Sequence, residues 1–148
     1  MYLLDTNVLS ELMREQPAPE VLHWFATHLS GDMVTSSVTQ AEILTGIALM
    51  PEGRRQTALA LAAAGMFEKD FSCPCLAFDS EAAQRYALLI ASRQRRGLPI
   101  SVQDAQIAAI ALAAGLIVVT RNTKDFENIE GLEVSTPRCR FRSSSSKC

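Results

Sequence analysis

The feature that most constrains the fold of this chain is the run of four apolar residues at positions 116–119. A strand that is apolar throughout is buried on both faces, as in parallel sheets that helices cover on both sides. Further strands are expected at residues 2–4, 33–36, 75–78 and 132–134, with longer segments of helical pattern between them. Strands alternating with helices predict an α/β fold with a central, mostly parallel sheet flanked by helices on both faces.

The helical segments have recognisable ends. Apolar spacing and composition predict helices at residues 8–15, 21–29, 38–50, 54–66, 80–96 and 101–114. Pro17 and Pro19 are expected to interrupt the chain between the first two helices. Asp79 and Ser80 form a suitable N-cap for the fifth helix, and Gly115 is the expected C-terminal cap of the sixth.

The composition is that of an ordinary globular domain. Hydrophobic residues make up 48% and charged residues 20% of the 148 positions, which excludes a disordered chain. We expect one domain over residues 1–137 and a flexible tail, basic and then serine-rich, over residues 138–148. No apolar run is long enough to span a bilayer and no secretory signal is visible, so no membrane partner is expected and the cytoplasm is the expected location. The net charge of −2 argues neither for nor against a nucleic-acid partner.

The cysteines do not indicate a redox or zinc site. Cys73 and Cys75 are separated by one residue, and Cys139 and Cys148 lie far along the chain. No pair has the CxxC spacing of a redox site, and neither histidine is spaced with a cysteine pair as zinc ligands are.

Four acidic residues each lie at the edge of an apolar element. Asp5 ends the first strand, and Asp125 lies in the polar loop after residues 116–119. Glu42 and Asp104 are each expected in the first turn of a helix. Because the carboxyl ends of parallel strands meet at one edge of a sheet, all four are expected together at that edge.

Each acidic residue, taken singly, also has a structural explanation. Asp5 is suited to cap a helix, and Glu42 and Asp104 each follow a Thr or Ser by three positions, as in a capping box. Four such caps at one edge are harder to explain, because crowded carboxylates repel one another unless a cation neutralises them. Oxygen ligands without Cys or His favour Mg²⁺ or Mn²⁺ over zinc.

A magnesium or manganese site of this kind suits phosphodiester hydrolysis. The ion lowers the pKa of a bound water and offsets charge on the phosphorus. Neutral side chains near the acidic residues are candidates to add oxygen ligands or to orient the water; they are Thr6, Asn7, Thr120 and Asn122.

Four segments of the chain, in order, resemble the PIN-domain ribonucleases. They are residues 3–8 (LLDTNV), 37–42 (SVTQAE), 104–109 (DAQIAA) and 119–126, which contains Val-Thr-Arg-Asn and Asp-Phe. Their order and spacing are most similar to the VapC toxins of bacterial toxin–antitoxin pairs, including the FitB-like subgroup. The similarity extends to about residue 137 and leaves the tail outside.

The resemblance implies that Asp5, Glu42 and Asp104 hold the metal. A fourth ligand is implied in the loop after residue 119, where Asn122 and Asp125 are the alternatives. The resemblance further implies an endoribonuclease that depends on Mg²⁺ or Mn²⁺, acts on RNA and forms a homodimer. It also implies inhibition by a cognate antitoxin that wraps the toxin, with DNA contacted only through that antitoxin. In the resulting hypothesis, metal-bound water attacks the phosphodiester.

The densest basic run of the domain is Arg93, Arg95 and Arg96, at the end of the fifth predicted helix. Complementation of the helix dipole together with solvation is the favoured interpretation. The alternative is contact with RNA phosphates, in which further cations near the acidic edge would join them, namely Arg14, Arg121 and Lys124.

Three other functions are weighed against the nuclease. A phosphatase with an aspartyl nucleophile would use Asp5, but the second acid expected two residues later is replaced by Asn7. A phosphoacceptor signalling module would need an acidic pair upstream of its acceptor, and the chain has none. A catalytically silent PIN-like binding protein would lack metal-dependent RNA cleavage.

Overall fold

The computed structural model describes residues 1–28, 30–71 and 75–138. The expectations for Leu29, Cys73, Cys139, Cys148 and the serine-rich tail therefore lie outside the described residues.

The centre of the molecule is a parallel sheet of four short strands, in the order β2-β1-β3-β4. β1 (Tyr2–Leu4) lies between β2 (Met33–Val34) and β3 (Ile117–Val119), and β4 (Val134–Ser135) pairs with β3. Leu4 is paired in register with Val119. The predicted parallel sheet is confirmed, with β1 and β3 as its inner strands.

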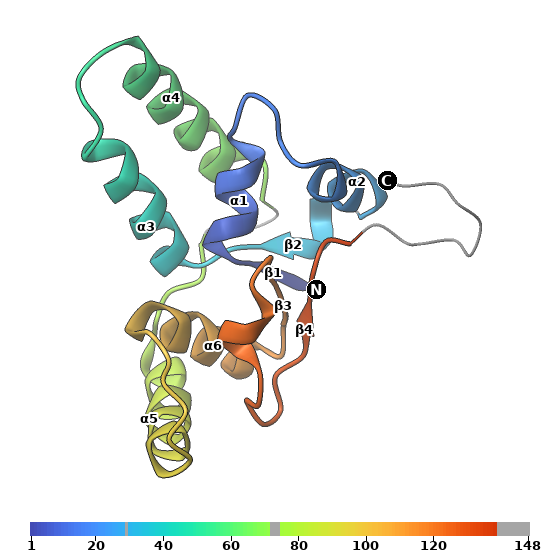
Figure 1. Ribbon diagram of the computed structural model, residues 1–148, viewed down its shortest axis with the longest axis vertical. Coiled ribbons are helices and arrows are strands. Elements are labelled where there is room, and N and C mark those ends of the chain that lie inside the picture. The colour runs from blue at the N-terminus through green and yellow to red at the C-terminus, as the bar shows by residue number, and fades with distance from the viewer. Residues whose placement is uncertain (29, 72–74, 139–148) are drawn as a thin grey trace.

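Helices cover both faces of this sheet (Figure 1). They are α1 (Thr6–Leu12), α2 (Pro19–Thr27), α3 (Ser37–Ala48), α4 (Arg54–Lys69), α5 (Ser80–Arg95) and α6 (Val102–Ala114). Two short 3₁₀ helices are η1 (Ser30–Asp32) and η2 (Thr123–Phe126). Over the described ranges, no helix is both long and apolar enough to cross a membrane.

The core is divided by the sheet into two layers because successive strand residues point to opposite faces. Leu3 and Val118 pack with residues of α5 and α6 and with Phe126, whereas Leu4 and Val119 pack with residues of α1 to α4. These strand side chains are fully buried, each contributing about 1.5–3 kcal/mol of hydrophobic stabilisation. Both faces of the strands are therefore apolar, and only the strand ends are available for polar side chains.

The first two helices differ from the predicted bounds at both ends. α1 begins at Thr6, because Asp5 is its N-cap, and it ends at Leu12 rather than at residue 15. Pro19 starts α2 instead of only separating the helices. Proline is favoured in a first helical turn, where its missing N–H would have no intrahelical partner.

The predicted strand at 75–78 was wrong. Leu76 makes a single parallel bridge with Ser36, in which Leu76 N donates to Thr35 O and Ser37 N donates to Leu76 O. The strand expected at 33–36 likewise ends at Val34, because Ser36 serves as the N-cap of α3. A hydroxyl that accepts a hydrogen bond from a backbone amide in the first turn of a helix favours the end of the strand pairing at that residue.

Candidate metal centre

Asp5 lies at the carboxyl end of an inner strand. Its backbone N–H continues the ladder by donating to Val119 O at 2.9 Å, so its position is set by the sheet. Its side chain is 5% exposed. Oδ1 accepts a hydrogen bond from Thr6 N at 2.8 Å, and Oδ2 accepts one from Thr120 Oγ1 at 2.9 Å. Asp5 is thus both the helix cap and the buried carboxylate at the sheet edge.

Thr120 is buried beside Asp5, and its hydroxyl makes several of the hydrogen bonds at this edge of the sheet. The residue follows β3, and its hydroxyl accepts hydrogen bonds from Asn7 Nδ2 and from Asn122 N, each at 3.1 Å. The Asn7 Oδ1 in turn accepts from Arg121 N at 3.0 Å. Asn7 and Thr120 therefore join the ends of β1 and β3 and hold the Asp5 carboxylate. These bonds engage Asn7 and Thr120, two of the four neutral side chains that were predicted to add metal ligands or to orient water.

Glu42 reaches the same edge from α3. Its Oε1 accepts a hydrogen bond from Thr6 Oγ1 at 2.9 Å. The prediction that Glu42 lies in the first helical turn was wrong, because the helix begins at Ser37 and Ser36 Oγ, rather than Thr39, caps it by accepting from Thr39 N. Glu42 is consequently exposed, one turn further along, and has no capping role.

Asp104 is in the first turn of α6, as predicted. Ser101 is the N-cap, and its Oγ accepts from Asp104 N at 3.1 Å. This bond uses the backbone of Asp104 and leaves its carboxylate half-buried, near enough to Asp125 and Glu42 for them to raise its pKa.

Asp125 lies in η2, where a plain loop had been predicted. Its Oδ2 accepts a hydrogen bond from Asn122 Nδ2 at 2.6 Å. Asn122 therefore supports the Asp125 carboxylate, and the two alternatives for the fourth ligand are joined by one hydrogen bond.

The four carboxylates interact unfavourably with one another. Burial raises the pKa of Asp5 to about 6, opposed by its hydrogen bonds and reinforced by Asp104 and Glu42. Burial also raises the pKa of Asp104, opposed by Ser101 and reinforced by Asp125 and Glu42. In the part of the chain that the structure describes, none of the four makes an ion pair with Lys, Arg or His.

This donor set fits a hard divalent cation by its chemistry. Carboxylate oxygens on four different elements share an edge, and their repulsion is not compensated by any described cation. The side chains do not form a closed cluster: among the described residues, no three acidic, histidine or cysteine side chains are close enough to count as a preformed metal site. The chain thus supplies the ligand types and their common edge, without a completed coordination shell.

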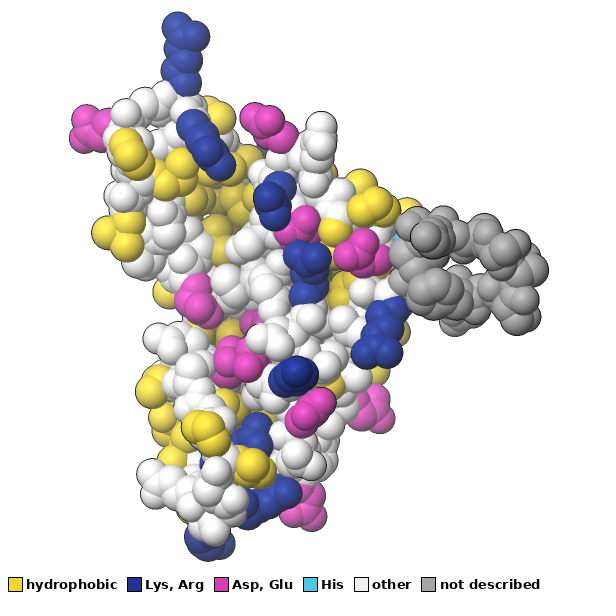
Figure 2. Space-filling model, in the orientation of Figure 1, with side chains coloured by type: hydrophobic (Ala, Val, Ile, Leu, Met, Phe, Trp, Pro, Cys, Tyr) yellow, Lys and Arg dark blue, Asp and Glu magenta, His cyan; other side chains and the backbone are white. Residues whose placement is uncertain are grey.

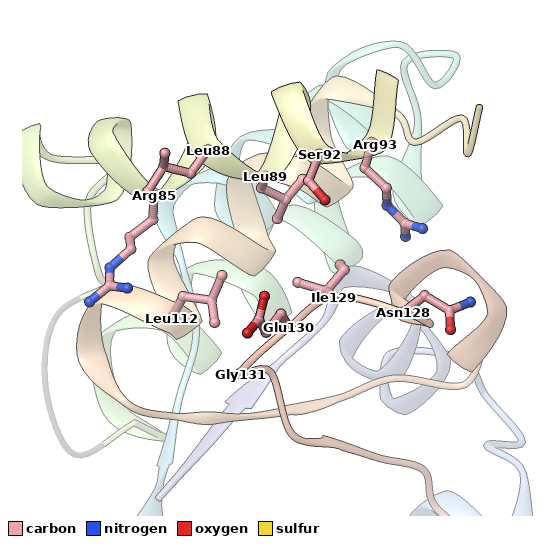
Figure 3. A pocket seen from close by; sticks show the side chains of 10 residues that line it. All are labelled: Arg85, Leu88, Leu89, Ser92, Arg93, Leu112, Asn128, Ile129, Glu130 and Gly131. Carbon is pink, nitrogen blue, oxygen red and sulfur yellow. The ribbon is translucent and has the colours of Figure 1, made fainter. Parts of the chain in front are cut away.

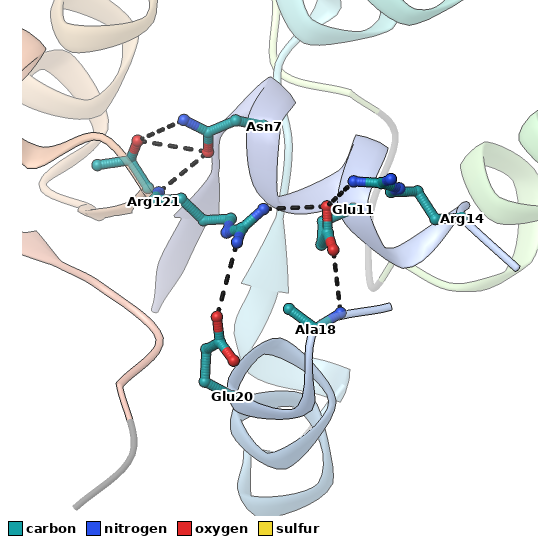
Figure 4. A network of polar contacts seen from close by, with 7 residues as sticks. Asn7, Glu11, Arg14, Ala18, Glu20 and Arg121 are labelled. Carbon is teal, nitrogen blue, oxygen red and sulfur yellow. Dashed lines mark hydrogen bonds and ion pairs between the residues drawn. The ribbon is translucent and has the colours of Figure 1, made fainter. Parts of the chain in front are cut away.

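Arg121 does not face the carboxylates. Its Nη1 lies 3.0 Å from Glu11 Oε2 and its Nη2 lies 3.6 Å from Glu20 Oε1. Figure 4 shows the guanidinium extending toward α1 and α2. Glu11 also accepts from Ala18 N at 3.0 Å. The predicted role of Arg121 in binding RNA or orienting water therefore competes with a network that joins three segments of the chain.

The arginines of the run lie at the end of α5, where they complement the helix dipole as predicted, but the predicted solvation was wrong for Arg93. This residue is 6% exposed, and its Nη2 donates to Asp125 O at 3.5 Å. Arg96 Nη1 donates to Asn128 O at 2.9 Å, and Arg95 is exposed. The contacts of Arg93 and Arg96 were not predicted from the sequence. The available signal was the three-residue spacing of these two arginines, which places them on the same face of a helix.

Surface grooves adjoin the acidic edge on both sides of Glu42. One, of about 630 Å³, runs between α3 and α6 and includes Gln103 and Gln106. The other, of about 240 Å³, lies between α1, α3 and α4 and includes Arg14 and Arg55. Figure 2 shows acidic side chains in the middle of this face, between the α3–α4 arm and the α5–α6 arm. A cavity of about 340 Å³ beside α5 contains none of the four carboxylates.

The comparisons with known proteins agree with this geometry. The PIN-domain family model matches residues 2–132. The plasmid stability protein StbB of Pseudomonas syringae pv. tomato is 42% identical over 137 residues, which cover 93% of this chain and 98% of StbB. VapC ribonuclease Y4jK of Sinorhizobium fredii is 37% identical over 137 residues, covering 93% and 97%. The chain belongs to the PIN-domain family and, within it, to the VapC-type toxins, as the resemblance predicted.

Solved structures extend the similarity to the fold. The structure of FitAB bound to an IR36 DNA fragment contains a chain that matches with a TM-score of 0.84 at 31% identity, covering 97% of this chain and all of that one. A toxin–antitoxin complex from Klebsiella pneumoniae matches with a TM-score of 0.65 at 27% identity, covering 93% and 98%. The predicted PIN-like fold is confirmed.

Proposed function

We propose that this protein is a Mg²⁺- or Mn²⁺-dependent endoribonuclease and acts as the toxin of a toxin–antitoxin pair in the cytoplasm. The observation that carries the proposal is that four carboxylates from four separate elements lie along the carboxyl edge of the sheet and act on one another's pKa values, while no described cation pairs with any of them. The name of the Sinorhizobium relative supports the ribonuclease class.

The four acidic residues are the proposed ligands of the ion. Asp5, Asp104, Glu42 and Asp125 would hold the ion. When bound, a divalent cation lowers the pKa of a coordinated water and offsets charge on the reacting phosphate. Thr6 N and Thr120 hold both oxygens of Asp5, so this carboxylate is fixed in orientation before an ion or substrate arrives.

The neighbouring side chains would guide the substrate. Arg14 and Arg55 line the groove on one side of Glu42 and are suited to contact phosphates of an RNA strand. Gln103 and Gln106 line the other groove and offer amide groups to base edges or to the 2′-hydroxyl. A strand that passes over Glu42 would present one phosphodiester to the carboxylates.

A cognate antitoxin and a second copy of the chain are the proposed protein partners. Large apolar side chains remain exposed on α4, on α5 and at the C-cap of α3: Leu49 at 80%, Leu61 at 70% and Leu88 at 70%. Single exposed leucines are normal on protein surfaces, so the relatives carry this part of the proposal. The toxin–antitoxin complex from Klebsiella pneumoniae supports a similar association here, and DNA would be contacted only through the antitoxin.

Cleavage of RNA by the purified, antitoxin-free protein tests the proposal. We expect cleavage with Mn²⁺ or Mg²⁺, no cleavage with excess chelator, and recovery when metal is restored. Asp104→Asn should reduce the rate by about 100-fold or more, as loss of a charged group at a reacting centre does. Glu127→Gln, which removes an exposed charge next to η2, is the matched control and should cleave normally.

Mapping RNA 5′ ends in cells then identifies the substrate. After brief induction, the wild-type chain should create new 5′ ends that the Asp5→Asn chain does not create. Metal-independent cleavage, or equal cleavage by the Asp104 variant, would remove the metal site from the proposal. Absence of any cleavage by a folded, metal-loaded protein would favour the silent binding protein.

The phosphatase alternative is disfavoured by one contact. Asn7, at the position where such an enzyme needs a second acid, bridges Thr120 and the backbone of Arg121. It is therefore a structural link between strand ends. Trapping of a phosphoaspartate on Asp5 would nevertheless restore the alternative.

A further inference from the structure

Two arginines at the end of α5 reach across to the segment that carries Asp125. Arg93 Nη2 donates to the backbone oxygen of Asp125 itself, at 3.5 Å. Arg96 Nη1 donates to the backbone oxygen of Asn128, at 2.9 Å. Figure 3 shows Arg93 extending from α5 toward the loop that contains Asn128. One helix therefore contacts two carbonyl groups that are three residues apart.

Folding stability alone does not account for Arg93. Its side chain is 6% exposed, and its Nε has no hydrogen-bond partner among the described residues. It also makes no ion pair with any described acid. A buried guanidinium with one long hydrogen bond is unfavourable, since it loses hydration without equivalent replacement. An unsatisfied buried group of this kind calls for an explanation other than packing.

The contacted segment contains a left-handed residue and a buried side chain. Asn128 has a φ of 61°, a left-handed conformation that asparagine adopts more readily than most other residues that have a side chain. Phe126, between the two contacted carbonyls, is 2% exposed and packs in the core. The arginines thus hold the backbone on both sides of an anchored side chain, and the Asp125 carboxylate carried by that backbone lies close enough to Asp104 to raise its pKa.

We propose that Arg93 and Arg96 are positioning residues that set the place of the Asp125 carboxylate at the metal centre. They act through the backbone and touch neither ion nor substrate. The proposal rests on the proposed function, because it assigns Asp125 to the metal shell. It also explains why the buried cation is tolerated: its benefit is the geometry of a ligand rather than the stability of the fold.

Binding of Mn²⁺ alone, measured by electron paramagnetic resonance or calorimetry without RNA, tests this role. Arg93→Met keeps an apolar stem in the same space and removes the donors. We expect it to weaken Mn²⁺ binding by about 10-fold, the usual effect of losing a group that orients a ligand. Arg95→Met is the matched control: Arg95 is exposed, has no partner in the described part of the chain, and its loss should leave Mn²⁺ binding unchanged.

A double-mutant cycle separates positioning from a general structural effect. If Arg93 acts through Asp125, then Arg93→Met should add no further loss of Mn²⁺ affinity in an Asp125→Asn background. Arg96→Met should behave in the same way with a smaller effect. Thermal unfolding of metal-free Arg93→Met should occur at or above the wild-type temperature, because the variant removes a poorly satisfied buried charge.

Three results would overturn the inference. They are unchanged Mn²⁺ affinity in Arg93→Met, equal losses with and without the Asp125 carboxylate, and failure of Arg93→Met to fold. Failure of the proposed function is distinguishable, because the wild-type protein would then bind no Mn²⁺ at these carboxylates and cleave no RNA. Wild-type binding and cleavage together with an additive cycle would reject the positioning role alone.

Discussion

Two neighbouring buried acids of this protein, Asp5 and Glu11, have pKa values that shift in opposite directions. Asp5 and Glu11 are almost equally buried, at 5% and 7% exposed, and α1 separates them by only six positions in sequence. Burial raises the pKa of Asp5 to about 6. For Glu11, burial also acts to raise the pKa, but the Ala18 N–H and the cations of Arg121 and Arg14 outweigh it, and the pKa is lowered.

The difference lies in what the chain provides around each carboxylate. Glu11 is neutralised within the chain, through the network in Figure 4, and it ties α1 to α2 and to the end of β3. Asp5 has neutral hydrogen-bond donors, and among the described residues the charged groups that act on its pKa are the acids Asp104 and Glu42. An acid that is paired internally stabilises the fold, whereas acids that are left unpaired together are available to a cation from outside.

The largest expected effect is on catalysis. Asp5→Asn should reduce RNA cleavage by about 100-fold or more, because it removes the charge at the centre of the acidic edge. Glu11→Gln is the counterpart in the neutralised group and should retain cleavage when assayed below its unfolding temperature. Single-turnover cleavage of a defined RNA compares the two. Similar losses in both variants would erase the functional distinction between the groups.

The second expected effect is on the stability of the metal-free protein. The folded-state pKa of Asp5 lies near 6, above its ordinary value of 3.8, so the folded state binds the proton more tightly than the unfolded state. Stability should therefore fall as pH rises from about 4 to about 6, and stay lower above that range. The shift of about two units corresponds to at most about 3 kcal/mol.

Chemical denaturation between pH 4 and pH 8 measures this dependence. Asp5→Asn should flatten the decline and be more stable than wild type at pH 7.5, in the absence of metal. Glu11 has the opposite sign: its lowered pKa contributes stability above its ordinary value of 4.5 that is lost as pH falls through the lowered folded-state value. Glu11→Gln should consequently be less stable at pH 7.5. A less stable Asp5→Asn protein would contradict the comparison.

The third expected effect is stabilisation by metal. A cation that binds only the folded state at 100 times its Kd adds about 2.7 kcal/mol to the free energy of unfolding. Thermal unfolding with added Mn²⁺ should show this increase for wild type and for Glu11→Gln. It should be small or absent in Asp5→Asn. An equal increase in all three proteins would place the bound ion elsewhere.

The smallest expected effect concerns Arg121. Its side chain is 38% exposed, and it pairs with Glu11 and Glu20 across three segments. Because water screens such pairs, Arg121→Gln should destabilise the protein by only about 0.5–1 kcal/mol. Urea denaturation measures this change, while RNA cleavage should remain near normal. A large rise in the KM for RNA with unchanged stability would instead support the predicted contact with RNA.

The sequence was sufficient for much of the fold and part of the site. The apolar run at 116–119 and the alternation of elements predicted the parallel sheet, because strands buried on both faces carry that pattern directly. Asp5 and Asp104 were placed correctly, because a strand end and a capping Ser are local signals. The strand predicted at 75–78 failed, since a lasting ladder depends on a neighbour that the local pattern does not reveal.

Other features depend on contacts between distant segments. The N-cap of α3 is Ser36 rather than Thr39, so Glu42 lies beyond the first turn, and its contact with Thr6 joins α3 to the start of α1. The hydrogen bond between Asn122 and Asp125 likewise depends on how the loop after β3 folds into η2. Burial of Arg93 was not predictable from the arginine run, since only the packing of α5 over η2 removes that guanidinium from water.

The sequence by itself determined the kind of chemistry at the strand ends. The side chains there carry oxygen atoms that can bind a metal ion, because the apolar faces of the strands leave no other position for polar groups. What only the tertiary structure decided is which of the acids are neutralised. Glu11 and Asp5 are both acidic residues near the start of the sequence. The pairing of Glu11 with Arg121 requires the ends of β1 and β3 to meet. Charge compensation acts through distance and solvent exposure, and neither is set until the chain has folded.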